Sequence, residues 1–234
     1  MDAYDYKARL APVTVMAVPA LALGAALFGL GAWRAGLGLL IGVSGLHFLL
    51  MQFVRDRGFA QQDRLFKKWG GSPTMQLLRW TSGTNRVLTA HRHHEVSRAT
   101  GIALPSAADE TSDLDAATHT YETAITVLRD RTRADGFGLI MRHNATYGFR
   151  RNLYGCRPIG ITVAVVTACL GGALIAFPVF DSATTNQSWI VAVLVLSILW
   201  ILMWSSAITE TFVRRAADQY ANSLIEAAGR LEAA

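Results

Sequence analysis

Hydrophobic positions in this chain gather in two long blocks, separated by a polar segment. The first block runs from about Ala11 to Val54 with a turn at residues 32–35, and the second runs from Pro158 to Ile208 with a break at residues 180–188. Four stretches in these blocks carry no charged residue, namely 11–33, 35–54, 158–180 and 182–209. About 20 apolar residues suffice for a helix to cross the hydrocarbon core, where the backbone must satisfy its own hydrogen bonds. The pattern therefore predicts four transmembrane helices in two hairpins.

The distribution of Lys and Arg predicts how these hairpins are oriented. The 32–35 turn holds only Arg34 and the 181–188 loop holds no basic residue, whereas residues 55–157 hold sixteen of the 22 Lys and Arg. Two more, Lys7 and Arg9, precede the first predicted span, and Arg214 and Arg215 follow the last. Because basic loops stay on the cytoplasmic side, we expect both termini and the polar segment to be cytoplasmic. The expected location is a bacterial cytoplasmic (inner) membrane, with the chain crossing it several times.

The polar segment shows helical periodicity and no strand-like alternation. We expect the second span to continue as a helix to Gly70-Gly71, and a short helix to open at Ser72-Pro73. Further helices are expected over Asn85–Ala99, Asp113–Arg133 and Phe137–Tyr154, with a loop over Gly101–Thr111. The predicted fold class is an all-α integral membrane protein with four segments. Residues 1–54 form the N-terminal segment and the first transmembrane hairpin, and residues 55–157 form a helical cytoplasmic domain. Residues 158–208 form the second hairpin, and residues 209–234 form a cytoplasmic amphipathic helix.

Two patterns predict contacts between helices. In the tail, a heptad seam is formed by Val213, Ala217, Tyr220, Leu224, Ala227 and Leu231. In the spans, small residues that let helices approach closely form ridges at Gly38, Gly42, Ala164, Ala168 and Gly172. Both patterns suit a homo-oligomer, with Leu224 and Leu231 as tail contacts. The alternatives are that the tail packs on the central domain and that the spans pack on each other within one chain.

One ionisable residue lies deep in a predicted span. His47 shares a helix face with Ser44, and an ionisable residue in the membrane is a functional candidate because it is costly to bury. A neutral His47 that is hydrogen-bonded to Ser44 or to a neighbouring backbone is the alternative.

The run from His91 to Glu95 has the residue types of a metal site. On a helix His91, His94 and Glu95 lie close together, and His119 or His143 could add a ligand to a zinc site. No His-Glu-x-x-His spacing is present. A solvated helix face is the competing interpretation, and no cofactor is predicted.

The same run contains a spacing known from nucleases. Arg86 and His91 fit an Arg-x4-His pattern that resembles the motif of HEPN-type ribonucleases, so a membrane-bound nuclease or metal hydrolase is one alternative function. No Walker loop or Gly-x-Ser-x-Gly motif is present, and no catalytic residue is assigned.

Basic pairs occur at both membrane junctions of the polar segment. Lys67 and Lys68 end the helix that leaves the second span, and Arg150 and Arg151 end the helix that enters the third. We expect the two pairs to meet at the cytoplasmic face and to bind an anion. Membrane lipid headgroups are the simpler partner, and the sequence does not require nucleic acid.

Three strings in the polar segment carry a family resemblance. They are Phe66-Lys67-Lys68-Trp69-Gly70-Gly71-Ser72-Pro73-Thr74, Leu104-Pro105-Ser106-Ala107-Ala108-Asp109-Glu110 and Tyr147-Gly148-Phe149-Arg150-Arg151-Asn152-Leu153. In them the chain resembles a family of uncharacterised bacterial four-span membrane proteins. The resemblance implies no activity, although small membrane proteins of this kind are often encoded in antiphage-defence operons.

These observations favour a non-enzymatic membrane protein. We expect a homo-oligomer that couples a cytoplasmic signal, a cytosolic protein or an anionic ligand to rearrangement of the membrane helices, with pore formation or an antiphage effector role as one outcome. The alternative is a static membrane anchor or scaffold for a cytosolic enzyme. A pore should carry a polar stripe, and the spans offer few polar residues besides Thr162, Thr167 and Ser197.

Overall fold

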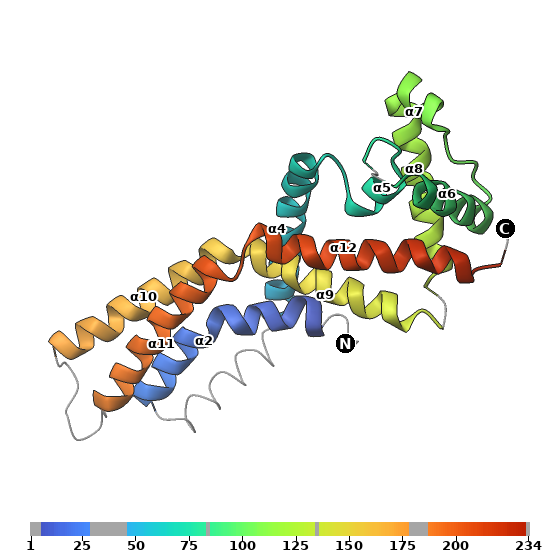
Figure 1. Cartoon of the computed structure of the whole chain (residues 1–234). Coiled ribbons are helices and arrows are strands. Elements are labelled where there is room, and N and C mark those ends of the chain that lie inside the picture. Colours follow the sequence, from blue (N-terminus) through green and yellow to red (C-terminus); the bar gives the residue numbers. More distant parts are fainter. Residues whose placement is uncertain (1–5, 29–45, 83–84, 134–135, 178–186, 233–234) are drawn as a thin grey trace. The chain divides into compact units, whose positions relative to one another are not determined.

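The computed structural model describes residues 6–28, 46–82, 85–133, 136–177 and 187–232 (Figure 1). Every regular element among these residues is a helix, which confirms the all-α prediction. The chain divides into two compact units, each built from two separate stretches. Unit 1 comprises residues 1–61 and 148–213, and unit 2 comprises residues 62–147 and 214–234. The divisions fall inside α4 (Leu46–Trp69), α9 (Gly138–Gly155) and α12 (Glu210–Ala227).

Unit 1 contains the apolar helices. The π-helical turn η1 (Tyr6–Leu10) leads into α2 (Ala11–Phe28), which lies beside α10 (Arg157–Ala176) and α11 (Gln187–Ser206) in Figure 1. Three segments are long and apolar enough to cross a membrane: Ala8–Phe28, Arg157–Ala176 and Gln187–Ser206. Only 22% of the α10 and α11 windows is buried inside the protein, so most of their apolar surface faces outward. Such a surface is typical of helices in contact with lipid, because hydrocarbon tails solvate apolar side chains.

The predicted second span lies mostly outside the described residues, since it covers 35–54 and the structure describes none of 29–45. From Leu46 onward this segment is helical as α4, and its exposed large apolar side chains are Phe48, Leu49, Phe53 and Phe59. The described residues therefore establish three apolar helices of membrane-spanning length.

A close approach of the Gly160 backbone to the Trp204 side chain joins α10 to α11. A Cβ atom on Gly160 would lie 2.3 Å from Cε2 of Trp204, whose side chain is fully buried. Only glycine leaves room for the indole at this position. One turn earlier in α11, Trp200 Nε1 donates a hydrogen bond of 2.8 Å to the carbonyl oxygen of Val15 in α2. The helices α2, α10 and α11 are thus held together by the fit of Trp204 against Gly160 and by the hydrogen bond from Trp200 to Val15.

Unit 2 is built on short, well-capped helices. They are α5 (Pro73–Leu78), α6 (Arg86–Thr100), α7 (Ala107–Ser112) and α8 (Leu114–Arg131), together with parts of α4, α9 and α12 and the 3-10 turn η2 (Ala228–Arg230). Ser72, Asn85 and Asp113 each accept a hydrogen bond from a backbone N–H in the first turn of α5, α6 and α8 respectively. Such caps satisfy amides that the helix itself leaves unpaired.

One helix begins where the sequence predicted a loop. The segment Gly101–Thr111 was expected to be a loop, but α7 begins inside it at Ala107. The side chains of Ser106 and Asp109 form a reciprocal capping box, with Asp109 N donating to Ser106 Oγ at 3.2 Å and Ser106 N to Asp109 Oδ2 at 3.0 Å. These two bonds stabilise a helix start that is too short to show periodicity.

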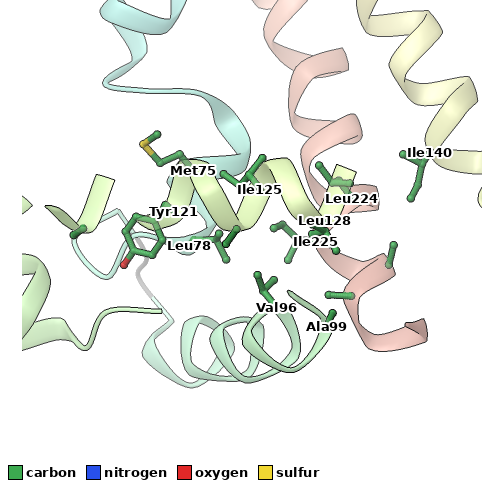
Figure 2. Close-up of a cluster of buried hydrophobic side chains, with 14 residues drawn as sticks. Met75, Leu78, Val96, Ala99, Tyr121, Ile125, Leu128, Ile140, Leu224 and Ile225 are labelled. Carbon is green, nitrogen blue, oxygen red and sulfur yellow. The ribbon is translucent and has the colours of Figure 1, made fainter. Parts of the chain in front are cut away.

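Apolar side chains from five helices form the core of unit 2 (Figure 2). Leu78 of α5, Val96 of α6 and Leu128 of α8 are fully buried. Leu224 of α12 is also fully buried in this cluster, with Ile225 beside it. The tail helix therefore packs on the core of its own chain, as the intramolecular alternative for the heptad seam expected.

Candidate functional site

The histidine run lies on α6 and its members face different surroundings. His91 and His94 are exposed, while Glu95 Oε2 accepts a 2.6 Å bond from Arg98 Nη2. Nowhere in the described part of the chain do three His, Cys, Asp or Glu side chains gather as a metal site would require. His91, His94 and Glu95 therefore do not gather into a metal site in the described part of the chain.

The histidine that matters for the fold is one that the sequence did not single out. His93 is buried, and its Nε2 lies 2.6 Å from the carbonyl oxygen of Leu78, so this nitrogen carries the proton. Its ring lies 4.6 Å from that of Trp80 and 5.7 Å from that of Tyr121. Burial lowers the pKa of His93 below its usual value, against the opposing effects of the Leu78 bond and of Glu110.

Glu110 is a buried carboxylate that joins three parts of unit 2. The residue is 1% exposed, and its oxygens accept bonds from Trp80 N at 3.0 Å, Thr81 N at 3.2 Å, Thr81 Oγ1 at 2.9 Å and Tyr121 Oη at 2.6 Å. Burial alone would raise the pKa of Glu110, but these bonds together outweigh it and hold the pKa below its usual value. Glu110 therefore fixes the turn after α5 against α8.

The predicted anion-binding residues divide between the two units. In unit 1, Arg150 donates to the carbonyl oxygen of Phe212 at 3.0 Å and its guanidinium lies 4.5 Å from the Phe212 ring centre. Arg151 is 6% exposed, lies 4.0 Å from the ring centre of Phe59 and donates to Oδ1 of Asn152. Both arginines thus have structural partners inside unit 1. A contact of Arg150 and Arg151 with Lys67 and Lys68 stays a prediction.

The other predicted residues have different surroundings. Ser44, Gly38 and Gly42 lie outside the described residues, and of His47 only the helical backbone of α4 is described. Ala164 is fully buried and Ala168 half-buried, while a Cβ atom on Gly172 would meet nothing within 4 Å. Leu231 is partly buried and packs against the core that holds Leu224.

The polar residues of the described spans do not form a stripe of free hydroxyls. Thr162 Oγ1 donates to Pro158 O at 2.9 Å, and Ser197 Oγ donates to Val193 O at 2.8 Å, each one turn earlier in its own helix. Thr167 and Ser197 are buried.

Unit 2 contains an open cleft of about 670 Å³. Its wall is formed by the end of α4, the turn into α5, and α8, and its lining residues are Gln62, Phe66, Lys67, Gly70, Gly71, Ser72, Met75, Arg79, Thr118, Glu122, Ile125, Thr126 and Arg129. Three of these side chains are cationic and one is anionic, while Phe66, Met75 and Ile125 supply apolar surface. Of the predicted anion ligands, Lys67 lines this cleft.

One stripe of α8 forms a wall of this cleft. Thr118, Glu122, Thr126 and Arg129 recur at intervals of three or four residues, which places them on one helix face. Arg79 reaches this stripe, because its Nη2 donates to Thr118 Oγ1 at 3.0 Å. Its Nε is buried and has no hydrogen-bond partner. Periodicity of α8 could have revealed the stripe, but its pairing with Arg79 depends on a contact across 39 residues.

A polar clamp lies beside the cleft-lining turn Gly70-Gly71. Gln76 of α5 donates through Nε2 to the carbonyl oxygen of Trp69, and Arg214 of α12 donates through Nη2 to Gln76 Oε1 at 2.5 Å. The Arg214 guanidinium also lies 4.7 Å from the Trp69 ring centre, and its Nε lies 2.9 Å from Asp218 Oδ1. We call Trp69, Gln76 and Arg214 the clamp.

Gly70 and Gly71 follow the clamp residue Trp69 and line the cleft with φ values of +76° and +124°. Side chains other than hydrogen are strained at such angles, so this turn requires glycine. The turn therefore connects the lining of the cleft directly to the clamp.

Comparison with protein-family models, curated proteins and solved structures finds no match to this chain. The candidate site is therefore argued from its own geometry.

Proposed function

We propose that the chain is a membrane-embedded receptor, in which unit 1 lies in the bilayer and unit 2 receives a signal at the cytoplasmic face. Binding at the cleft of unit 2 shifts the clamp, and the helices that enter unit 1 rearrange in response. The receptor acts as a homo-oligomer and catalyses no reaction. Three apolar helices of membrane-spanning length support the location, and the abundance of Lys and Arg in residues 55–157 supports the cytoplasmic side.

The clamp is the observation that carries this proposal. It joins the last residue of α4 to α12, and the division between the two units falls inside both helices. A helix transmits displacement along its axis because its backbone bonds are continuous. A ligand that displaces the Gly70-Gly71 turn would therefore act on two helices that extend into unit 1.

The connection to the apolar helices is short. α11 ends at Ser206 and α12 begins at Glu210, so Arg214 lies just after the last candidate span. Thr209 helps to fix this link, since its Oγ1 accepts a bond of 3.3 Å from Phe212 N. A shift of Arg214 would thus reach α11 through few residues.

Hydrogen exchange of the full chain in lipid nanodiscs tests the coupling without any ligand. Arg214→Gln removes the cation over Trp69 and weakens the bond to Gln76, so faster exchange is expected around residues 66–76. If the units are coupled, amides of α11 also exchange faster. Arg215→Gln is the matched control, because Arg215 is the neighbouring residue, is exposed and carries the same charge.

The two candidate functions differ in this experiment. A change confined to unit 2 in the Arg214→Gln variant would leave a static anchor or scaffold as the function. An equal change in the Arg215→Gln variant would show that charge near the membrane matters, and not the clamp.

A further inference from the structure

We propose that the cleft of unit 2 binds a phosphate-bearing small molecule that also carries an apolar or aromatic group. Lys67, Arg79 and Arg129 bind the phosphate, and the apolar lining holds the other end. This inference names the ligand of the proposed receptor. The binding site itself stands whether or not binding moves the membrane helices.

Size and charge agree with such a ligand. Small-molecule sites occupy about 300–1,000 Å³, and this cleft measures about 670 Å³. Its three cationic side chains exceed the single carboxylate of Glu122 by two charges. An anion is therefore attracted to the cleft, and one with two negative charges would balance it.

Arg79 gives this cleft a feature that a simple basic surface lacks. The side chain is half-buried, and Thr118 accepts a bond from its Nη2, so the guanidinium is held in place. Its Nε is buried with no partner among the described residues, so this nitrogen lies out of reach of a ligand in the cleft. A guanidinium suits phosphate oxygens because it binds them through charge-assisted bonds in a fixed planar geometry.

The rest of the lining indicates that the ligand is more than inorganic phosphate. Phe66 is half-buried and offers apolar surface that a bare anion could not use, while Met75 and Ile125 add only the 6% and 3% of their surface that stays exposed. Glu122 and Thr126 are exposed on the α8 stripe, where the carboxylate can accept bonds from hydroxyl or amino groups of a ligand. A nucleotide combines these features, and so does the headgroup region of an anionic phospholipid.

Binding is tested with a fluorescent nucleotide, N-methylanthraniloyl-ADP, and the full chain in phosphatidylcholine nanodiscs. We expect saturable binding that ADP displaces and adenosine does not, because adenosine lacks the phosphates. Lys67→Gln and Arg129→Gln should each weaken binding about tenfold, the effect of losing one charge-assisted bond. Arg86→Gln, on exposed α6 surface outside the cleft, should bind as the native chain does.

A variant without charge change separates a built site from a basic surface. Thr118→Val removes the acceptor that orients Arg79 and leaves the charge unchanged, so binding should weaken about fivefold. Arg79→Lys keeps the charge but loses the planar fork and should weaken binding at least as much. Circular dichroism confirms folding of each variant. If Arg79→Lys fails to fold, the Thr118→Val variant and the variants of the exposed residues Lys67 and Arg129 still test whether the cleft binds the ligand.

Nanodiscs that contain phosphatidylglycerol identify the source of the phosphate. If they abolish nucleotide binding to the native chain, and the Lys67→Gln/Arg129→Gln variant loses its association with phosphatidylglycerol vesicles, a lipid headgroup supplies the phosphate. Unchanged nucleotide binding in these discs assigns a soluble ligand. The proposal is overturned if Lys67→Gln and Arg129→Gln bind the nucleotide and the lipid as the native chain does, or if neither probe binds saturably. Because this assay reads binding alone, its failure is distinguishable from loss of coupling in the Arg214→Gln exchange experiment.

Discussion

The hydroxyl of Tyr121 donates a 2.6 Å hydrogen bond to Oε2 of Glu110, and both residues are buried. The bond joins the middle of α8 to α7, while the same carboxylate holds the backbone of Trp80 and Thr81 after α5. Burial and the neighbouring carboxylate raise the pKa of Tyr121, so the phenol stays a donor across the physiological range. The shape of unit 2 therefore depends on Glu110 being ionised.

The first prediction is acid-induced loss of stability in unit 2. The folded pKa of Glu110 lies below that of the unfolded chain, about 4.3, so its contribution is present above this pH and is lost as the pH falls through the folded value. His93 acts in the same direction, because its lowered pKa makes the folded state bind fewer protons below about pH 6.5.

Thermal unfolding followed between pH 7 and pH 3 measures this dependence. Glu110→Gln should be less stable than the native chain at pH 7 and should flatten the acid side of the profile. A variant with the native pH slope would show that other groups cause the acid sensitivity.

The second prediction concerns packing of α10 on α11. Gly160→Ala should destabilise unit 1, since the added Cβ would overlap the Trp204 ring at 2.3 Å and the indole is fully buried. Overpacking of this kind costs about 1–3 kcal/mol. Gly172→Ala in the same helix is the control, because its Cβ meets nothing within 4 Å. Heat-induced aggregation in detergent compares the two; equal midpoints would contradict the fit.

The third prediction separates tail packing from self-association. Leu224→Ala should destabilise unit 2 by about 2–5 kcal/mol, because the side chain is fully buried in its core. Leu231→Ala should cost less, since Leu231 is only partly buried. Denaturation at several protein concentrations is the measurement. A loss of stability that grows on dilution would assign Leu224 to a contact between chains.

The fourth prediction is the oligomer contact. Gly172→Leu should lower the oligomeric mass in detergent, because α10 has open space at this position among the described residues and a neighbouring chain would fill it. Gly172→Ala adds little bulk and serves as control. Equal oligomeric mass for the native chain and Gly172→Leu would exclude this face of α10 as the contact between chains. A monomeric native chain would contradict the homo-oligomer itself.

The fifth prediction is topology. In a chain lacking Cys156 and Cys169, Ser106→Cys at the start of α7 should resist an impermeant thiol reagent in intact cells and react after lysis. The reason is the excess of Lys and Arg in residues 55–157. Labelling in intact cells would show that residues 55–157 face outward, opposite to the predicted orientation.

Local features of the sequence predicted much of the fold. The length of the uncharged stretches predicted three helices that the structure describes, while the end of α4 and the start of α5 followed from Gly70-Gly71 and Ser72-Pro73. These signals act within a few residues, so they need no knowledge of tertiary contacts. The sequence did not predict the short helix α7, because its 6 residues are too few to show a hydrophobic period.

The candidate site was visible only in part. Lys67 was predicted as an anion ligand, but its partners Arg79 and Arg129 lie 12 and 62 positions further along the chain. The role of Glu110 also depends on contacts across about 30 residues, since Trp80 and Thr81 lie in another element. Charge patterns identify basic residues, while long-range packing decides which of them share a cleft.

Unit 2 is discontinuous in sequence, and this sets an order on its biosynthesis. Leu224, Ile225, Ala227 and Ala228 complete a core whose other members lie between Met75 and Ile140. The ribosome must first translate residues 148–213, with α10 and α11, which takes roughly 3–13 s at about 5–20 residues per second. During that interval the apolar surface that Leu224 will cover stays open to solvent. Synthesis of α10 and α11 therefore precedes closure of the core of unit 2, and a ribosome stalled before Arg214 would leave a nascent chain with exposed apolar surface that chaperones and proteases can recognise.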